Sequence, residues 1–359
     1  MLLAANLILS CARRPETSPW RSVMIPTDAD FAGVWFSDSL NGWITGGGWA
    51  IEGGIIGRTR DGGRSWTFQS GLAPGAGAGS GFGRVQFRDS LRGCVVGSGG
   101  TVMLTDDGGE NWRPATHGGR AGAALYGLQF IDALNGWAIG PGSIVRTEDG
   151  GETWRRLIRS DNENGYLSGS AVHFLDASRG WLAGQAAEFM RSDDGGSNWI
   201  PVTLPLPSGQ RPALRDVFFL DRRLGWVVGE EGVIFHTEDG GERWVRQQLG
   251  VPVVRVLAKG EKPKHDVVPE LDVPPDRLAL HAVRFANSNR GWAVGYYADA
   301  AESVVLGTRN GGATWTVERT QPGELLRSLF ALDTLHVWAA GDRARTSPQV
   351  ILRYAPAER

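Results

Sequence analysis

One eight-residue motif, T-x-D-G-G-x-x-W, constrains the fold of this 359-residue chain more than any other feature. It occurs six times, and its central acidic or amide residues are 46, 42, 45, 45 and 71 residues apart. The copies span 59–66, 105–112, 147–154, 192–199, 237–244 and 308–315. A period of about 45 residues indicates a row of equivalent supersecondary units rather than several unrelated domains.

A second motif runs in step with the first. It consists of a V-x-F-like triplet, a polar turn and Gly-Trp, as in 128–140, 172–184 and 217–229. The second unit has Cys94 in place of the tryptophan, and a seventh copy at 329–341 has no D-G-G turn after it. Each unit therefore predicts four short strands, a to d, with strand a at the triplet and strand d after the D-G-G turn. Four strands in about 45 residues are typical of a β-propeller blade.

The seventh unit shows how the ring would close. It supplies strands a and b, then QVILRY (349–354) as strand c, but no strand d. WRSVMI (20–25) resembles a strand d without its turn. We therefore predict an all-β, seven-bladed β-propeller of four-stranded blades, formed by residues 20–359 as one domain. The N-terminal strand would complete the last blade, so that no blade is left with an open edge at the closure.

The D-G-G turns have a structural rationale. Glycine tolerates the positive φ angles that a tight turn between strands c and d requires. The carboxylate before the glycines accepts hydrogen bonds from the turn's own backbone, and the following tryptophan supplies apolar surface between blades. We predict a structural rather than catalytic role for these residues, which are Asp61, Asp107, Asp149, Asp194, Asp239 and Asn310.

These turns resemble the Asp-box, or BNR, repeat of sialidases, sortilin-type receptors, xyloglucanases and photosystem II assembly and stability factors. The pairing of F-x-D-x-x-x-G-W with T-x-D-G-G-x-x-W in one unit is most similar to the last family, over about residues 20–354. The resemblance implies a non-catalytic binding protein. In photosynthetic members of the family, the propeller is an extracytoplasmic, chaperone-like factor that binds reaction-centre precursors, in part through an arginine-rich patch.

The N-terminus resembles a bacterial lipoprotein signal. An apolar run at 2–9 precedes Cys11, and residues 12–19 have the composition of a short tether. We predict that residues 1–19 form a signal and tether, with a lipid on Cys11, and that the protein is periplasmic and membrane-tethered. The alternatives are an ordinary cleaved signal and an apolar tail without a targeting role.

The residues just before each V-x-F triplet should ring one mouth of the channel, on the face where propellers usually bind ligands. We predict a partner-binding site formed by Arg84, Tyr126, Arg215, His281 and Arg327. Three arginines on a protein of net charge −2 suit carboxylates, acidic loops or lipid headgroups. The alternative is that these arginines are solvated or paired within the protein.

Loop lengths suggest a second set of contacts. The connections between strands b and c are long in units 1, 6 and 7, at 46–54, 295–303 and 341–349. A polar, proline-rich insertion at about 249–280 joins units 5 and 6 on the same face. Because functional residues concentrate on loops held by a rigid scaffold, we predict contacts on this 6–7–1 sector. They are Trp49, Tyr296, Tyr297, Arg343 and Arg345. Random drift in loop length is the alternative.

Several function classes are disfavoured. The charge balance argues against nucleic-acid binding, and two cysteines cannot form a disulfide framework or a zinc ribbon. The histidines show no metal-ligand spacing, and no Gly-rich loop opens a helix, so we expect no metal, cofactor or enzymatic activity. We predict a scaffold that binds a membrane protein or membrane complex.

The alternative function is a carbohydrate-binding or glycoside-hydrolysing propeller. Hydrolysis would need two carboxylates about 5–10 Å apart, for which Asp216 with Glu230 or Glu231 is the candidate pair. A sialidase would also need an Arg-Ile-Pro segment, which this sequence lacks.

Overall fold

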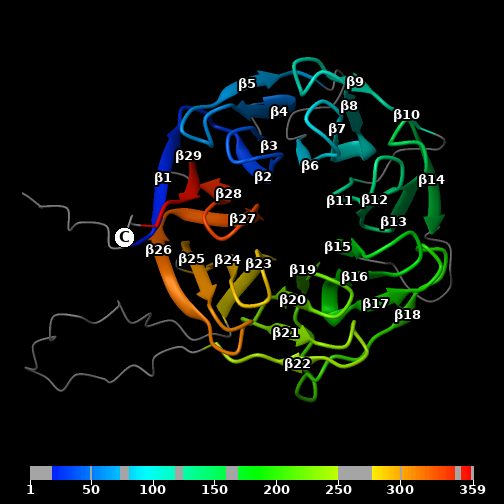
Figure 1. Ribbon diagram of the computed structural model, residues 1–359, viewed down its shortest axis with the longest axis vertical. Coiled ribbons are helices and arrows are strands. Elements are labelled where there is room, and N and C mark those ends of the chain that lie inside the picture. The colour runs from blue at the N-terminus through cyan, green and yellow to red at the C-terminus, as the bar shows by residue number, and fades with distance from the viewer. Residues whose placement is uncertain are drawn as a thin grey trace, which may run out of the picture.

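The computed structural model describes residues 18–48, 51–72, 81–117, 124–158, 169–249, 277–299, 301–343 and 349–356. These residues form seven antiparallel sheets arranged around a central axis, with strand a of each sheet innermost (Figure 1). The prediction of an all-β, seven-bladed propeller is confirmed. Blade 3 differs from the others because a short fifth strand pairs in parallel with its outer strand.

The blades follow one another along the chain, and each runs from strand a to strand d. Blade 1 contains β2 (Asp30–Phe36), β3 (Gly42–Gly48), β4 (Ile51–Thr59) and β5 (Thr67–Ser70). Blade 2 contains β6 (Phe82–Phe87), β7 (Gly93–Gly97), β8 (Val102–Thr105) and β9 (Arg113–Pro114). Blade 3 contains β11 (Gly127–Phe130), β12 (Gly136–Gly140), β13 (Ser143–Thr147) and β14 (Thr153–Ile158), and its fifth strand is β10 (Thr116–His117).

The remaining blades keep the same order. Blade 4 contains β15 (Gly169–Phe174), β16 (Gly180–Gly184), β17 (Phe189–Ser192) and β18 (Ile200–Pro201). Blade 5 contains β19 (Leu214–Phe219), β20 (Gly225–Gly229), β21 (Ile234–Thr237) and β22 (Val245–Arg246). Blade 6 contains β23 (Leu278–Phe285), β24 (Gly291–Tyr297), β25 (Glu302–Thr308) and β26 (Thr316–Pro322). Blade 7 contains β27 (Glu324–Ala331), β28 (Val337–Arg343), β29 (Gln349–Tyr354) and β1 (Trp20–Ile25).

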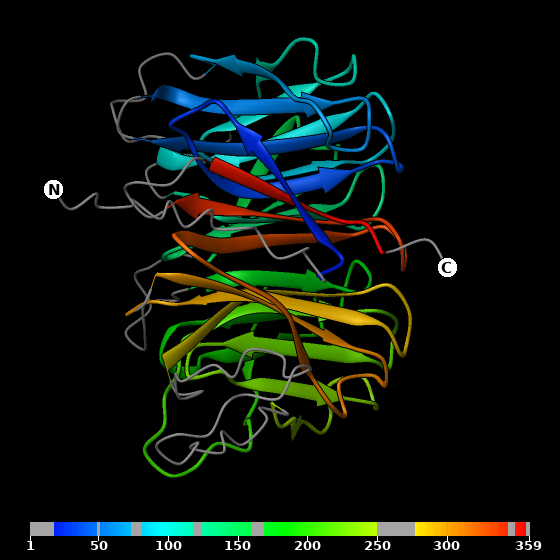
Figure 2. The same ribbon diagram turned by 90° about the vertical axis from the view of Figure 1, so that its left-hand side faces the viewer.

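The N-terminal strand closes the ring as predicted. β1 pairs antiparallel with β29, with Trp20 opposite Tyr354 and Ile25 opposite Gln349. The dark blue strand lies beside the red one on the rim of the molecule (Figure 2). The two ends of the chain thus lie in one blade, and the backbone hydrogen bonds between β1 and β29 close the ring.

Adjacent blades are joined by stacked aromatic rings. The tryptophan of strand b lies flat against the phenylalanine that ends strand a of the next blade, with ring centroids 3.5–4.1 Å apart at five blade interfaces. The tryptophan after each D-G-G turn meets the same phenylalanine edge-on, at 5.8–6.0 Å. Each phenylalanine of these five interfaces is therefore held between two indoles, and burial of these large rings stabilises the contact between blades.

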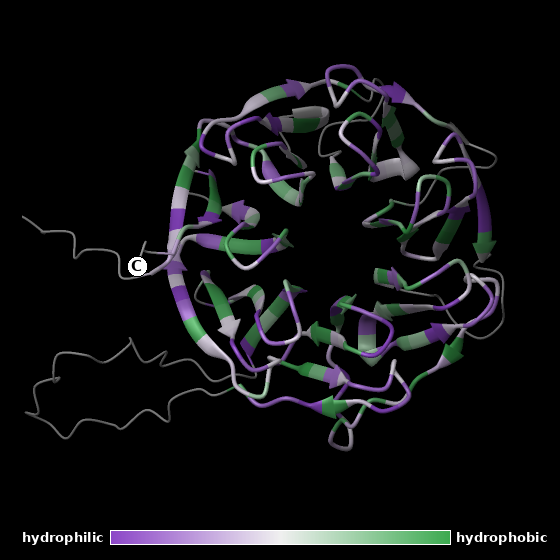
Figure 3. Ribbon diagram, in the orientation of Figure 1, coloured by the Kyte–Doolittle hydropathy of each residue, from purple (hydrophilic) through white to green (hydrophobic). Residues whose placement is uncertain are grey.

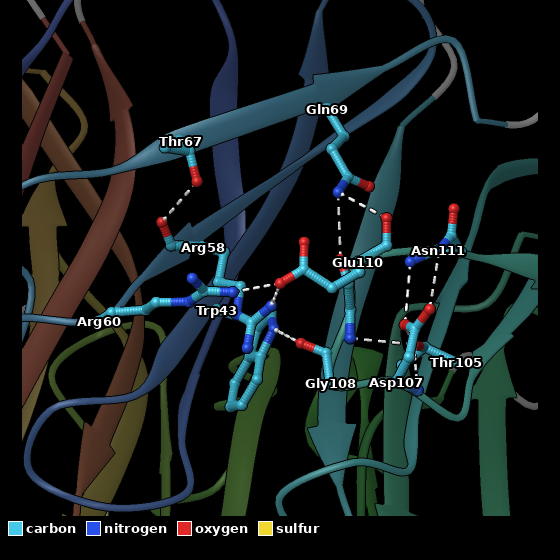
Figure 4. Close-up of polar contacts among 11 residues, drawn as sticks. Trp43, Arg58, Arg60, Thr67, Gln69, Thr105, Asp107, Gly108, Glu110 and Asn111 are labelled. Atoms are coloured by element: carbon cyan, nitrogen blue, oxygen red, sulfur yellow. Dashed lines mark hydrogen bonds and ion pairs between the residues drawn. The ribbon is translucent and has the colours of Figure 1, made fainter.

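The D-G-G turns fix the position of these tryptophans (Figure 4). In blade 2, Asp107 accepts hydrogen bonds from the backbone and side-chain nitrogens of Asn111 at 2.9 and 2.8 Å. The indole Nε1–H of Trp43, from blade 1, donates to the carbonyl of Gly108 at 3.2 Å. Gly108 and Gly109 have φ angles of +74° and +86°, which residues with a Cβ rarely adopt. The turn therefore organises both its own hairpin and the contact with the preceding blade.

The interface between blades 6 and 7 is built differently, because Ala331 stands where other blades have the phenylalanine. Trp292 instead meets Tyr354 of blade 7 edge-on at 5.4 Å. Arg290 donates to the Tyr354 hydroxyl at 3.1 Å and to Glu318 of its own blade at 2.8 Å. The Nε1–H groups of Trp20 and Trp292 also donate to Glu318, at 3.0 and 3.2 Å. Both charged groups thus have hydrogen-bonding partners in place of water, which is the condition for tolerating a buried ion pair.

Hydrophobic residues lie mainly in the strands, whereas the connecting loops are largely hydrophilic (Figure 3). The strand b segments of blades 2 to 5 are buried throughout, in keeping with their central place in each blade. Among the residues that the structure describes, no helix is both long enough and apolar enough to cross a membrane.

Trp20→Ala tests the closure. The side chain is fully buried and donates to Glu318, so its loss should lower the free energy of unfolding by about 3–5 kcal/mol. Met24→Ala on the same strand is the control, because Met24 is exposed and should change the free energy by less than about 0.5 kcal/mol. Urea unfolding measures both values. Equal stability of the two variants would mean that β1 does not close the ring in solution.

The loss of stability at acidic pH tests the hydrogen bonds that the turn carboxylates accept. Hydrogen bonds from the backbone and side chain of Asn111 lower the pKa of Asp107 to about 2, and backbone hydrogen bonds from Arg92 and Leu91 help lower that of Asp89 to about 2. Because these values lie below the ordinary 3.8, the ionised carboxylates stabilise the fold above about pH 4, and this contribution is lost as the pH falls towards 2. The Tm should therefore fall across this range.

Asp107→Asn should flatten that fall, because it removes one titrating group while keeping an acceptor oxygen. The chain contains its own precedent: Asn310 accepts from the Thr314 backbone at 2.9 Å in the blade 6 turn. Scanning calorimetry between pH 2 and 6 measures the difference. An unchanged slope in the variant would show that Asp107 does not contribute to acid unfolding.

Candidate functional site

Every strand a carries one extra residue near its start, and these residues meet at one mouth of the channel. The pairing with strand b shifts by one residue in six blades, which leaves a single bulged residue unpaired in each. In blade 3, Tyr126 donates to Ile139, the residue that Gly127 faces. The seven bulged residues line one cavity of about 320 Å³, which we call the mouth cavity. They are Ala32, Gly83, Tyr126, Ser170, Arg215, His281 and Arg327.

The five residues that the sequence placed at the mouth all line this cavity. Four are bulged residues, and the fifth, Arg84, directly follows the bulge of blade 2. Arg84 reaches across Gly33 and donates to the Ser328 hydroxyl at 3.0 Å. Burial lowers the pKa of its guanidinium, with a further lowering from Arg284. The mouth cavity therefore has a desolvated cation in its wall.

The two bulged arginines are already paired with carboxylates. Arg215 contacts Glu230, and Arg327 contacts Asp342. Both guanidinium groups remain partly exposed, at 27% and 38% of their side-chain surface. Desolvation raises the pKa of Asp342, against the opposing effect of Arg327. The alternative that these arginines are paired within the protein is therefore partly correct. The exposed parts of both guanidinium groups still line the cavity.

Two stacked rings of blade 6, Tyr296 and His281, lie at the mouth cavity. The Tyr296 ring stacks on His281 with centroids 4.8 Å apart, and the Arg327 guanidinium lies 5.4 Å from the centre of the same ring. Burial and the neighbouring Arg327, Arg215 and Arg84 lower the pKa of His281 to about 3. The imidazole is therefore neutral at physiological pH, and the arginines alone supply the positive charge.

A second cavity of about 380 Å³ continues from the mouth between blades 1 and 2. It shares four lining residues with the mouth cavity, so the two form one depression. Its floor contains five glycines, and we call it the glycine trough: Gly46, Gly47, Gly48, Gly81 and Gly83. A bridge between Gly47 and Gly81 joins the two blades there. A Cβ at Gly46, Gly81 or Gly83 would meet the protein's own backbone at 1.9, 3.0 and 3.0 Å, so these glycines allow neighbouring strands to pack closely there.

The other predicted contacts have mixed placements. Tyr296 faces the mouth, but Tyr297 is 4% exposed and packs in the apolar cluster between blades 5 and 6. Arg343 ends β28, where its backbone pairs with Glu324. Trp49, Arg345, Cys11 and most of the 249–280 insertion lie outside the described residues.

The candidate carboxylate pair is not arranged for hydrolysis. Asp216 is 3% exposed and accepts hydrogen bonds from the Val283 backbone at 3.0 Å and from Arg284 at 2.5 Å. Glu230 is held by Arg215. Across the described residues, no group of three or more His, Cys, Asp or Glu side chains could hold a metal ion. The mouth cavity is lined by three arginines and by the rings of Tyr126 and His281.

Sequence reasoning missed two features of this site. Asp342 was not identified as a partner of Arg327: the sequence placed it in the long connection of unit 7, whereas it lies within β28. The glycine trough was also missed, although the run Gly46–Gly47–Gly48 in the unit 1 connection was a visible signal.

Comparison with known proteins identifies similar chains. A family model described as photosynthesis system II assembly factor YCF48 matches residues 12–114, 80–166 and 162–254. A solved structure described as YCF48 bound to D1 peptide is 19% identical, with a TM-score of 0.66, covering 94% of this chain and 97% of that one. YCF48 from Cyanidioschyzon merolae is 16% identical, with a TM-score of 0.65, covering 94% and 98%. No curated protein matches the chain.

The protonation state of His281 provides a direct test of the mouth geometry. The ¹H NMR signal of its imidazole should stay constant between pH 5 and 8, because its pKa is about 3. Arg327→Ala should raise that pKa by removing a nearby positive charge, whereas Arg222→Ala, on a turn at the opposite end of its blade, should leave it unchanged. A midpoint above pH 5 in the unmodified protein would contradict the buried position of this ring.

Proposed function

The chain belongs to the photosynthesis system II assembly factor YCF48 family, and on this basis we propose that it is a non-catalytic assembly factor that binds a membrane-protein complex through the mouth cavity. The observation that carries the proposal is the convergence of Arg84, Arg215 and Arg327 on one cavity of about 320 Å³. All seven blades contribute to it, so the site exists only in the closed ring.

The chemistry of the cavity favours an acidic segment of a protein. Arginines bind carboxylates through charge-assisted hydrogen bonds, and Tyr126, which is half exposed, offers an aromatic surface at the rim. The comparison structure is described as bound to D1 peptide, which shows that a related propeller binds a peptide. We infer that this chain also binds an extended peptide segment, with a carboxylate group against the arginines.

The glycine trough gives such a segment a path away from the mouth. Ala32 and Gly83 are the smallest of the bulged residues, and they line both cavities together with Tyr126 and Arg327. A peptide whose acidic end lies against Arg84 and Arg215 would leave across this low side, over blades 1 and 2. Its main chain would lie over glycines, so binding would require little complementarity between side chains there.

The remaining parts of the proposal concern catalysis and location. A non-catalytic role is supported by the burial of Asp216, which belongs to both candidate carboxylate pairs, and by the ion pair that holds Glu230. We propose an extracytoplasmic location and a lipid on Cys11, on the evidence of the apolar run at 2–9. The elaborated connections at Trp49, Arg343 and Arg345 would then add contacts beside the mouth.

An affinity pull-down from crosslinked, detergent-solubilised source membranes, read by mass spectrometry, tests the function. The unmodified protein should enrich subunits of one membrane complex. The double variant Arg215→Ala/Arg327→Ala should reduce that enrichment about tenfold or more, because each charge-assisted hydrogen bond is worth about 1.5–3 kcal/mol.

Arg222→Ala is the matched control, since this exposed arginine lies on the turn between strands a and b of blade 5, away from the mouth. It should enrich the complex as well as the unmodified protein does. If the double variant retains the complex, the mouth cavity is not the binding site. If the unmodified protein enriches no membrane protein, the proposed function is wrong.

A further inference from the structure

The turns between strands a and b carry a row of exposed leucines at the end of the channel opposite the mouth cavity. Each of these turns begins with Asp or Asn, and the residue two positions later lies at its tip. In blades 7, 1, 2 and 3, which are consecutive around the closed ring, this residue is leucine, and 50–57% of its surface is exposed. We call this set the leucine arc: Leu335, Leu40, Leu91 and Leu134.

The remaining three blades have polar residues at the same position, namely Ser178, Arg223 and Asn289. Among the described residues, nine large hydrophobic side chains are exposed, and five of them are the leucine arc and its neighbour Leu332. Exposed apolar side chains are thus concentrated on one side of one face. A grouped set of this kind indicates an interaction surface more strongly than scattered exposed residues would.

The backbone of the arc is already satisfied within the protein. Leu40 donates its N–H to Asp38 at 2.8 Å and accepts from the Gly62 N–H at 2.9 Å. Leu91 and Leu134 make the same pair of contacts with their own aspartates and D-G-G turns. Covering these turns would therefore bury leucine side chains without leaving backbone groups unpaired, so the cost of desolvation is low.

The charge around the arc limits what can cover it. In blades 2 and 3, the turns and flanking residues at 88–92, 105–113, 131–135 and 146–153 carry eight carboxylates against four arginines. The corresponding residues of blades 7 and 1, at 332–336, 37–41 and 58–67, carry three carboxylates and three arginines, so the negative charge lies at the blade 2 and 3 side of the arc. An anionic lipid surface would be repelled, and so would the same face of a second copy. Insertion into hydrocarbon would place ionised aspartates such as Asp89 and Asp132 in an apolar medium, which is costly.

We propose that the leucine arc docks a basic, amphipathic segment of a partner protein, on the face opposite the mouth cavity. The leucines would contact the apolar side of that segment, and the carboxylates of blades 2 and 3 would meet its cations. The surface is separate from the mouth cavity, so the propeller would hold two protein segments at once, one at each end of its channel.

Fluorescence anisotropy with a defined probe tests this surface. The probe is a labelled 18-residue amphipathic helical peptide of leucine and lysine, and its counterpart has glutamate in place of lysine. The full chain should bind the lysine peptide, more weakly as salt rises, and should not bind the glutamate peptide. Leu91→Ser/Leu134→Ser should weaken binding at least tenfold. Ile200→Ser, at a similarly exposed aliphatic on β18, should leave it unchanged.

The other outcomes overturn the proposal. If Leu91→Ser/Leu134→Ser and Ile200→Ser bind the lysine peptide with equal affinity, the leucine arc is not the binding site. Leucine-dependent sedimentation with phosphatidylcholine vesicles would identify a membrane surface instead, and leucine-dependent dimerisation in sedimentation velocity would identify a second copy. The mouth-cavity variant Arg215→Ala/Arg327→Ala should bind the lysine peptide as the unmodified protein does. Failure of the leucine-arc proposal can therefore be distinguished from failure of the proposed function of the mouth cavity.

Discussion

The stacked contact between the strand b tryptophan and the next blade's phenylalanine is the interaction on which the ring depends. Five of the seven interfaces use it. The two exceptions have other links. Where Cys94 replaces the tryptophan, the Arg88 guanidinium of blade 2 lies 5.1 Å from the centre of the Phe130 ring. Where Ala331 replaces the phenylalanine, Trp292 meets Tyr354 of blade 7 edge-on and Arg290 donates to the Tyr354 hydroxyl. A ring cannot close if one interface is missing, so every lost stack requires a substitute.

Repetition made the fold and part of the site predictable. Each V-x-F triplet marks the same place in its blade, so the residues just before it converge on one mouth. The ion pairs of Arg215 and Arg327 were not predictable, because Glu230 follows strand b, Asp342 lies near the end of strand b, and the approach of both depends on the bulged register. Tyr296 and Tyr297 were expected to lie together on a loop. β24 instead extends to Tyr297, and strand alternation turns one ring to the mouth and the other into the core.

The bulge explains how a repeated scaffold carries a site without symmetry. Most positions of strand a pack against a neighbour or pair with strand b, which restricts the residues they tolerate. The bulged position is an extra residue, opposite a residue of strand b that already faces its neighbour. Its side chain faces the cavity, and the seven blades place residues there as different as Ala32, Tyr126, Arg215 and His281. Recognition chemistry can thus differ from blade to blade while the aromatic stacks and D-G-G turns remain the same.

The same reasoning applies to the opposite end of the blades. At the turns between strands a and b, the first residue is fixed by its hydrogen bonds to the turn, as Asp38 is by the backbone of Leu40 and Asn41. The residue two positions later contributes only backbone to those contacts, so its side chain is unconstrained by the fold. Leucine at this place in four consecutive blades is therefore not required for folding, since Ser178 and Arg223 complete the same turn elsewhere. The two ends of the channel each have one freely variable position per blade, and a rigid ring keeps the surfaces they form apart.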